Sequence, residues 1–361
     1  MKNIPYIVFV LFLIISCQQQ YTREGAIYLY PAEKTMPFDS LISGMNLIYL
    51  EETEDLLIGE MNKIMKNGSI YYLLDSDKSQ SLFAYDEDGN YVSKYYARGG
   101  GPGEYNSILD FDIDIKSNEI AILCAPSKLI ITDLQLSFKR EISLDDDFYD
   151  RLAIIEGNVF LFSYYSGIIG KYDSNGILLK KNPISNKLVS GNVFFPQRVF
   201  YKLSDKYLMQ SPGDDIIYIE ENGEWAEYLS LDYEKKASST KLYTQKRADA
   251  ITFEEKIFHP LPYIRCFFEF KEKEYFVYLF GVLHYLNDGC NNFLFSELPG
   301  IGSLNYDNGH LYTWQYLSDF KLEDTIQNKT LHNIEIHTSG VNHKDELDDG
   351  SILLIDYIIK K

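Results

Sequence analysis

The sequence predicts an all-β fold in which one β-meander is repeated around a ring, and two observations carry this prediction. Short runs of β-branched and aromatic residues alternate with turns throughout the chain, which has 30 Tyr and 22 Phe among its 361 residues. Asx-Gly turns recur at Gly89, Gly176 and Gly223, and Asp133 divides the first interval. The resulting period of about 43–47 residues is typical of four-stranded propeller blades, whereas sandwiches have no such repeat.

The N-terminal residues predict export and lipid attachment. A lysine precedes a twelve-residue apolar run that ends at Ile15, which is too short to span a bilayer and suits the core of a signal peptide. The run leads into Ser16-Cys17, which looks like a bacterial lipobox. We expect residues 1–16 to be a signal peptide, Cys17 to be acylated, and residues 17–25 to form a lipidated tether. The alternative is an ordinary signal peptide with an incidental cysteine.

The expected location and partners follow from this anchor and from the charge. No Asp follows Cys17, so the tether differs from those of retained lipoproteins, and it lacks the acidic run that some lipoproteins use for surface export. We therefore expect an outer-membrane anchor facing the periplasm, with surface display as the second choice. The formal net charge of −19 argues against nucleic acid as a partner. The same charge predicts that anionic lipid repels the protein, so the acyl chains alone would keep the protein attached to the membrane.

The remaining chain, residues 26–361, is the predicted propeller domain. Its strands form five copies of one unit: a strand near the axis, a second strand, a turn, and an outer strand. These copies begin at residues 69–74, 119–124, 158–164, 206–210 and 274–280. Residues 26–30 and 351–359 are expected to share one blade and close the ring. We expect six blades, with seven as the alternative, because segment 234–258 does not resemble a blade and is expected to be an insertion.

A glycine-rich corner precedes one of the predicted strands. Glycine tolerates positive φ, and proline fixes its own φ and removes a donor, so the chain must turn sharply here. The corner lacks a dinucleotide fingerprint, because Glu104 replaces the third glycine and a strand rather than a helix follows. We assign it a structural role at a junction between blades, with Arg98 and Glu104 able to pair across it. The corner residues are Arg98, Gly99, Gly101, Pro102, Gly103, Glu104 and Tyr105.

Three aspartates follow the corner at every second position: Asp110, Asp112 and Asp114. On a strand they share one face about 6.5–7 Å apart, and they repel one another unless they are solvated or neutralised. A solvent-facing edge is the favoured explanation, and a calcium ion is the alternative. Asp75 begins a loop like those that bind calcium, but Gln80 replaces the required glycine. We therefore expect no cofactor, with calcium as the alternative at the three aspartates.

Several motifs, in a fixed order, resemble a known family. They are Leu50-Glu51-Glu52-Thr53, Ile70-Tyr71-Tyr72-Leu73-Leu74-Asp75, Phe83-Ala84-Tyr85-Asp86 and the glycine corner with Asp110-Phe111. Together they resemble the six-bladed β-propeller lipoproteins of Gram-negative anaerobes, relatives of the NHL-type propellers. The resemblance covers nearly the whole mature chain and is densest over residues 45–180. Ala97 departs from it, since that family more often has glycine before the arginine. The resemblance implies a fold and an envelope address, and no particular chemistry.

No catalytic constellation is evident in the sequence, so no catalytic residue is assigned. Neither H-E-x-x-H nor G-x-S-x-G occurs. We favour a non-catalytic envelope lipoprotein whose propeller binds an unidentified ligand or envelope protein. The alternative is an enzyme that acts on periplasmic carbohydrate or lactone-like substrates at the central channel. That enzyme would need acidic residues from three or more blades at cation-ligand spacing in the channel. A scaffold subunit, with a large exposed apolar patch, is a third hypothesis.

Overall fold

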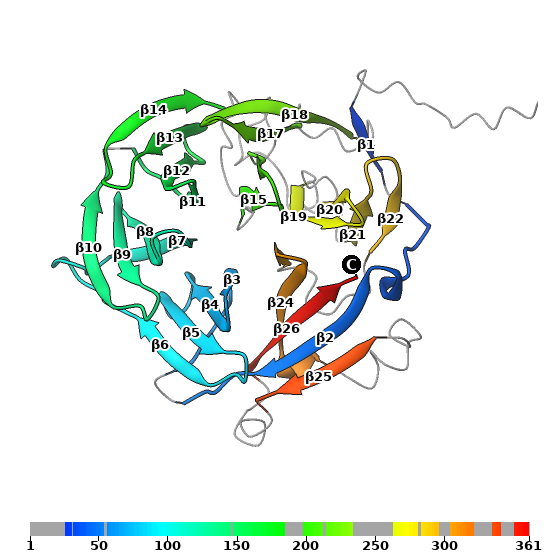
Figure 1. The fold of residues 1–361 in the computed structure, drawn as a ribbon, viewed down its shortest axis with the longest axis horizontal. Helices are drawn as coiled ribbons and strands as arrows, with labels where there is room; N and C mark the ends of the chain where they lie inside the picture. Colours follow the sequence, from blue (N-terminus) through cyan, green and yellow to red (C-terminus); the bar gives the residue numbers. More distant parts are fainter. Residues whose placement is uncertain are drawn as a thin grey trace, which may run out of the picture.

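The computed structural model describes residues 26–30, 32–53, 56–145, 147–184, 198–211, 214–233, 263–280, 283–295, 304–320, 334–340 and 350–360. Within these ranges six β-sheets stand around a common axis, which confirms the predicted six-bladed β-propeller (Figure 1). Helical structure there is limited to 3-10 turns at Phe38–Ser40 and Leu317–Asp319. No helix among the described residues is long and apolar enough to cross a membrane. The predicted signal peptide, Cys17 tether and 234–258 insertion lie outside the described ranges.

Blades 1 to 3 follow one another along the chain, and each has four antiparallel strands with its innermost strand first. Blade 1 contains β3 (Lys63–Asn67), β4 (Ile70–Asp75), β5 (Ser81–Asp86) and β6 (Tyr91–Tyr95). Blade 2 contains β7 (Ser107–Asp114), β8 (Glu119–Ala125), β9 (Lys128–Asp133) and β10 (Phe138–Ser143). Blade 3 contains β11 (Arg151–Ile155), β12 (Asn158–Ser163), β13 (Ile168–Tyr172) and β14 (Leu178–Pro183).

Blades 4 to 6 complete the ring, and two of them gain a fifth strand. Blade 4 contains β15 (Phe200–Lys202), β16 (Tyr207–Met209), β17 (Ile216–Glu221), β18 (Glu224–Tyr233) and β1 (Ile27–Leu29). Blade 5 contains β19 (Tyr263–Phe270), β20 (Lys273–Phe280), β21 (Leu283–Asn287) and β22 (Asn292–Leu294). Blade 6 contains, in spatial order, β23 (Asn305–Asp307), β24 (His310–Tyr316), β26 (Ile352–Ile359), β2 (Ile42–Tyr49) and β25 (Glu335–Ser339).

In each of the predicted units, one more strand lies between the axis and the strand that was predicted to be innermost. The expected axial strand of the first unit is β4, but β3 lies inside it, and the same offset holds for β8 and β12. Inner strands escape the hydrophobic pattern because their side chains partly face the channel, and β3 begins and nearly ends with lysine. The Asx-Gly turns were predicted correctly: Gly89, Gly176 and Gly223 have φ between 79° and 84° and join the third strand to the fourth.

The ring is closed by an N-terminal strand and the C-terminal strand, although not by the pair that was predicted. Strand β2 pairs antiparallel with β26, with Met45 opposite Tyr357 and Leu47 opposite Ile355. Residues 26–30 instead contain β1 (Ile27–Leu29), which pairs parallel with β18 in blade 4, so that part of the expectation is wrong. Strand length explains this choice. β2 has eight mostly buried residues, which match the eight of β26, whereas β1 has only three.

The residues before β2 run along the outer edges of neighbouring blades. After β1 has paired with β18 of blade 4, Thr35 bridges Leu294 of blade 5, whose N–H donates to Lys34 O at 2.7 Å. In blade 6, β25 adds to β2 in parallel. These contacts occupy outer edges that would otherwise present unpaired backbone groups.

A buried aspartate joins the closing blade to blade 1. Asp356 on β26 has no exposed surface. Its carboxylate lies 2.7 Å from His310 Nδ1 on β24, 3.1 Å from Tyr71 Oη on β4 and 3.3 Å from Asn46 Nδ2 on β2. The tyrosine and the asparagine donate hydrogen bonds to this one acceptor. Asp356 therefore connects three strands of blade 6 and one strand of blade 1 in the interior.

Replacing Asp356 with Ala should lower the free energy of unfolding by about 3 kcal/mol, because buried polar groups lose their shared acceptor. Equilibrium unfolding in urea measures the change. Asp205→Ala is the matched control: this aspartate is exposed, and its loss should alter stability by less than about 0.5 kcal/mol. A loss below about 1 kcal/mol for Asp356→Ala would show that the network does not support closure.

Candidate functional site

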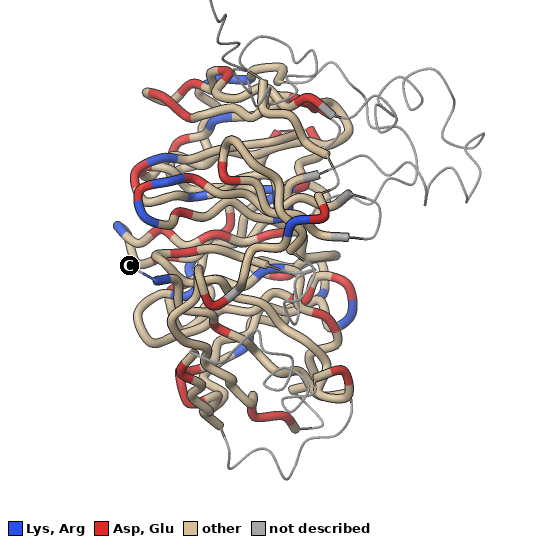
Figure 2. Tube along the Cα trace, turned by 90° about the vertical axis from the view of Figure 1, so that its right-hand side faces the viewer, with Lys and Arg blue, Asp and Glu red and all other residues tan. Residues whose placement is uncertain are grey.

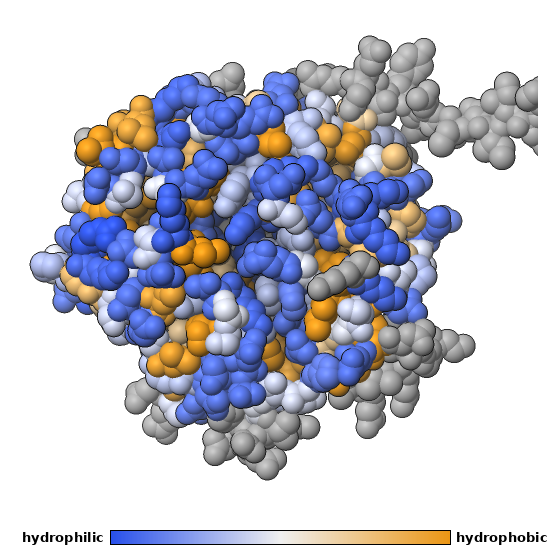
Figure 3. Space-filling model, viewed as in Figure 1, coloured by the Kyte–Doolittle hydropathy of each residue, from blue (hydrophilic) through white to orange (hydrophobic). Residues whose placement is uncertain are grey.

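A pocket lies at the centre of the ring, where inner strands converge. Its lining comes from β3, β7, β11, β15 and β23 with adjoining residues, so five of the six blades contribute. The pocket is open to solvent, and the space of about 70 Å³ within it accommodates several waters. The face shown in Figure 3 is largely hydrophilic around the axis, with apolar side chains in scattered spots. We call this the axial pocket.

Charged side chains of both signs line the axial pocket. Along the tube in Figure 2, acidic and basic residues are interspersed over the ring. The pocket differs from the chain as a whole, which carries a net charge of −19, because basic residues outnumber acidic ones in its lining. The charged lining residues are Lys63, Lys66, Arg198, Lys202, Asp112 and Asp307.

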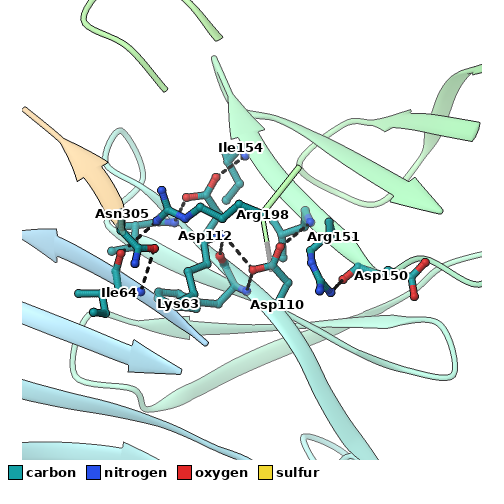
Figure 4. A network of polar contacts seen from close by, with 12 residues as sticks. Lys63, Ile64, Asp110, Asp112, Asp150, Arg151, Ile154, Arg198 and Asn305 are labelled. Atoms are coloured by element: carbon teal, nitrogen blue, oxygen red, sulfur yellow. Dashed lines mark hydrogen bonds and ion pairs between the residues drawn. The ribbon is translucent and has the colours of Figure 1, made fainter. Parts of the chain in front are cut away.

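Beside the pocket lies a buried ion pair between blades 1 and 2. Lys63 Nζ lies 2.9 Å from Asp110 Oδ1, and the two side chains are only 11% and 5% exposed. Lys63 also donates to Phe111 O at 2.6 Å. The second carboxylate oxygen of Asp110 accepts the Leu152 N–H of blade 3 at 2.9 Å. Asp110 therefore ties three blades together at the axis (Figure 4).

Protein groups contact every carboxylate of the aspartate row, and Asp110 has a counter-charge in Lys63. Asp112 Oδ2 accepts the Ile154 N–H of β11 at 2.7 Å. This donor lies two residues after Leu152, whose N–H binds Asp110. Burial raises the pKa of the Asp112 carboxyl, and nearby Lys63 acts against this rise. The expected solvent-facing edge is wrong for Asp110, which is 3% exposed. Only Asp114 meets a turn, where it accepts the Lys116 N–H at 3.0 Å.

A β-bulge changes which apolar residues share a face of β7. In a regular strand Leu109 would share a face with Phe111 and Ile113. The register shifts between Ile108 and Asp110, so Ile108 joins Phe111 and Ile113 in the core between blades 1 and 2. Leu109 packs instead against the core between blades 2 and 3. One inserted residue reverses the alternation that precedes it.

Polar side chains at other blade junctions perform the same task as Asp110 and Asp112. Asn305 Oδ1 of blade 6 accepts the Ile64 N–H of blade 1 at 3.5 Å, and Gln210 Oε1 of blade 4 accepts the Ile264 N–H of blade 5 at 3.3 Å. Inner strands have a free edge toward the axis, and a buried N–H there needs an acceptor. Each side chain supplies that acceptor from the preceding blade.

Arg198 and Asp307 complete the charged lining from blades 4 and 6. Arg198 Nη2 donates to Ile64 O at 3.1 Å, and among the described residues its buried Nε has no hydrogen-bond partner. In Figure 4 this arginine lies near Asn305 and Asp112. Burial raises the pKa of the Asp307 carboxyl, while the charges of Lys202 and Arg198 act in the opposite direction. Sequence reasoning missed these residues, since three-residue strands such as β15 and β23 carry no periodic signal.

The glycine corner joins β6 of blade 1 to β7 of blade 2 and lies outside the pocket lining. Arg98 and Glu104 do not pair: Arg98 Nη2 donates to Asn106 O at 3.1 Å, and Glu104 Oε2 accepts the Gly101 N–H at 2.7 Å. Glu104 lies so close that a Cβ on Gly99 would come within 2.1 Å of its carboxylate. The carboxylate therefore folds back onto the turn, out of reach of the arginine.

Other corner residues bind both flanking blades. The Gly103 N–H donates to Glu141 Oε2 of β10 at 2.9 Å, and Gly103 O accepts the Tyr95 hydroxyl of β6 at 2.5 Å. Tyr105 is 1% exposed and stacks with Tyr95 at a centroid distance of 6.2 Å. Pro102 is exposed at the tip of the turn. These contacts hold the corner as a rigid junction between two blades.

The loop that resembles a calcium site is held by backbone donors. Asp75 is fully buried, and its carboxylate accepts the N–H groups of Gly59 at 2.8 Å, Lys78 at 2.8 Å and Ser79 at 3.1 Å. Its oxygens thus meet donors where calcium ligands would meet a cation. Among all described residues, no group of three or more His, Cys, Asp or Glu side chains has the placement to hold a metal ion.

Comparison with known proteins confirms the six-bladed propeller fold. Residues 17–287 match the family described as 6-bladed beta-propeller. The chain is similar to the structure of a protein described as exported from Bacteroides fragilis NCTC 9343, with 18% identity, a TM-score of 0.67 and coverage of 93% of this chain and 99% of that one. A DUF4221 member from Bacteroides vulgatus ATCC 8482 has 12% identity and a TM-score of 0.52, with coverage of 89% and 97%. No curated protein matches the sequence.

The buried ion pair generates a stability prediction. Asp110→Ala should lower the free energy of unfolding by about 3–5 kcal/mol, because the Lys63 ammonium loses its counter-charge inside the protein. In the double variant Lys63→Met with Asp110→Asn, the loss should fall below about 2 kcal/mol, since no unpaired charge remains. Denaturant unfolding of both variants measures these changes.

The control for this prediction is Asp114→Ala, which alters the same row at its turn end and should cost less than about 1 kcal/mol. If Asp110→Ala and Asp114→Ala had equal effects, the buried pair would not be the element that joins the blades.

Proposed function

Because this chain belongs to the family of six-bladed β-propellers, we propose that it is a non-catalytic envelope lipoprotein that binds a ligand in the axial pocket. One observation carries the proposal: inner strands of five blades place charged side chains around one small cavity. A site assembled from many elements at the symmetry axis is a common arrangement for ligands in ring-shaped folds.

Charge placement in the axial pocket supports binding. Packing alone would favour apolar residues at the axis, because buried charges are costly unless they are paired. Lys63 meets that requirement through Asp110. Lys202 pairs with Tyr207 through its backbone, but its side chain makes no hydrogen bond or ion pair with any described residue, although it lines the pocket. A charge that the fold itself does not use is available to a ligand.

The carboxylates in the lining support binding more than catalysis. The alternative enzyme, acting on carbohydrate or lactone-like substrates, needs acids from at least three blades around a cation. In the described lining, the acids are Asp112 of blade 2 and Asp307 of blade 6. Both oxygens of Asp112 accept backbone N–H groups, from Ile113 at 2.8 Å and Ile154 at 2.7 Å. Asp112 is therefore committed to holding blades together.

An envelope address is supported by the sequence and by one relative. The lipobox-like Ser16-Cys17 predicts acylation, and two or more acyl chains on one cysteine anchor a protein stably. The similar Bacteroides fragilis protein is itself described as exported. We place the propeller on the outer membrane, facing the periplasm in the first instance and the cell surface in the second. In this arrangement the protein contacts the membrane only through the acyl chains on Cys17.

Ligand binding is testable with a panel of defined small compounds: hexoses, hexuronates, amino acids and inorganic phosphate. At least one should raise the melting temperature of the purified domain in a thermal-shift assay, because binding to the folded state alone stabilises it. Asn67→Trp places a bulky side chain in the lining and should abolish that shift. The absence of any shift, or conversion of the bound compound detected by NMR, would contradict the proposal.

The anchor makes a separate prediction. Cys17→Ala should move the protein from the membrane fraction into the soluble fraction of the envelope, since the acyl chains supply the membrane affinity. Fractionation followed by immunoblotting measures this. Cys290→Ala is the matched control, because Cys290 is an exposed free cysteine of the propeller and should leave the protein on the membrane. Membrane association of the Cys17 variant would refute lipid attachment at this residue.

A further inference from the structure

We infer that the axial pocket selects a small ligand that carries a carboxylate or phosphate group, held by Arg198 and Lys202. This inference deepens the proposed function and rests on it. Two observations determine the ligand class. The first is which basic side chains of the lining have no acidic partner among the described residues. The second is which polar and aromatic side chains lie beside them.

The basic side chains in the pocket lining outnumber the acidic ones, four to two, in a chain whose net charge is −19. Two of the four, Lys63 and Lys66, have their counter-charges just outside the lining, in Asp110 and Glu87. The basic residues that could serve a ligand are therefore Arg198 and Lys202. Low-dielectric walls strengthen the attraction of such charges for an anion.

The two lysines on β3 are already paired within the protein. Lys63 binds Asp110 and Phe111 O. Lys66 Nζ lies 2.8 Å from Glu87 Oε1 and 4.6 Å from the centroid of the Tyr71 ring. Neither ammonium is free to serve as the principal ligand group.

Arg198 and Lys202, on either side of Phe200, retain binding capacity. Arg198 uses Nη2 for Ile64 O, while its buried Nε has no hydrogen-bond partner among the described residues. Lys202 is half-buried and forms no ion pair with a described residue. A guanidinium and an ammonium together suit a carboxylate or a phosphate, since both anions accept several charge-assisted hydrogen bonds.

Asp307 adds a second requirement for the ligand. Its carboxylate lies close enough to Lys202 and Arg198 to feel their charges, but it forms no ion pair within 4.0 Å with a described residue. An anion bound to the two basic residues would be repelled by Asp307 unless the ligand also donates a hydrogen bond to it. Hydroxyl or amino groups next to the anionic group meet this need. Tyr207 and Phe200 supply aromatic walls for the remainder of the ligand.

Isothermal titration calorimetry at low ionic strength tests the inference with glucose, glucuronate and glucose 6-phosphate as probes. These share one sugar ring and differ in charge, so the two charged probes decide between carboxylate and phosphate. At least one of them should bind about tenfold or more tightly than glucose, and added salt should weaken it.

Three variants assign the contacts. Arg198→Gln and Lys202→Gln should each weaken the charged probe by about ten- to hundredfold and leave glucose unchanged, the usual effect of losing a charge-assisted hydrogen bond. Asp307→Asn should strengthen the binding of inorganic phosphate, because it removes a negative charge from the lining. The Lys202 side chain forms no hydrogen bond or ion pair in the described part, so its variant reports on binding even if Arg198→Gln fails to fold.

The outcomes separate this inference from the proposed function. Equal affinity for glucose and the charged probes, or unchanged affinity in Lys202→Gln, would overturn the anion inference while ligand binding stands. If neither the charged probes nor glucose bound, the anion inference would be overturned, and both would be overturned if no compound of the thermal-shift panel bound either. Selective binding of a charged probe that Lys202→Gln abolishes would support both.

Discussion

Ring closure between β2 and β26 is the constraint on which the rest of the structure depends. Each blade of a propeller packs on two neighbours, so the ring is stable only if the first and last blades meet. Here the closure is made within one sheet, by eight residues from the N-terminal part and eight from the C-terminus. Asp356 extends that closure into blade 1 through Tyr71. The position of every inner strand around the axis follows from this ring.

The axis poses a second physical problem, because inner strands have no neighbour on that side. Backbone N–H groups there must find acceptors, since leaving them unpaired in the interior costs free energy. The chain solves this with side chains from the preceding blade: Asp110, Asp112, Asn305 and Gln210. Structural need thus accounts for several polar residues at the centre of the ring. The residues that it does not account for, Arg198, Lys202 and Asp307, are those that we assign to a ligand.

The glycine corner shows how a distinctive motif can be unrelated to the site. Its glycines permit a turn in which Glu104 folds back on the Gly101 N–H, and Gly103 contacts both flanking blades. The sequence located this turn because glycine and proline act on the backbone locally. It did not reveal the partners of Arg98 and Glu104, because these depend on where the loop closes in space.

The sequence by itself determined the fold class and the hairpin turns and favoured six blades over seven, since these rest on local periodicity and on residues that accept positive φ. Only the tertiary structure decided which N-terminal strand closes the ring, that another strand lies inside each predicted unit, and which charges share the axial pocket. Lys63, Asp112, Arg198 and Asp307 are far apart in the chain, and no spacing rule connects them. They meet because the ring brings one short inner strand from each blade to a common axis, and that geometry exists only once the chain has closed.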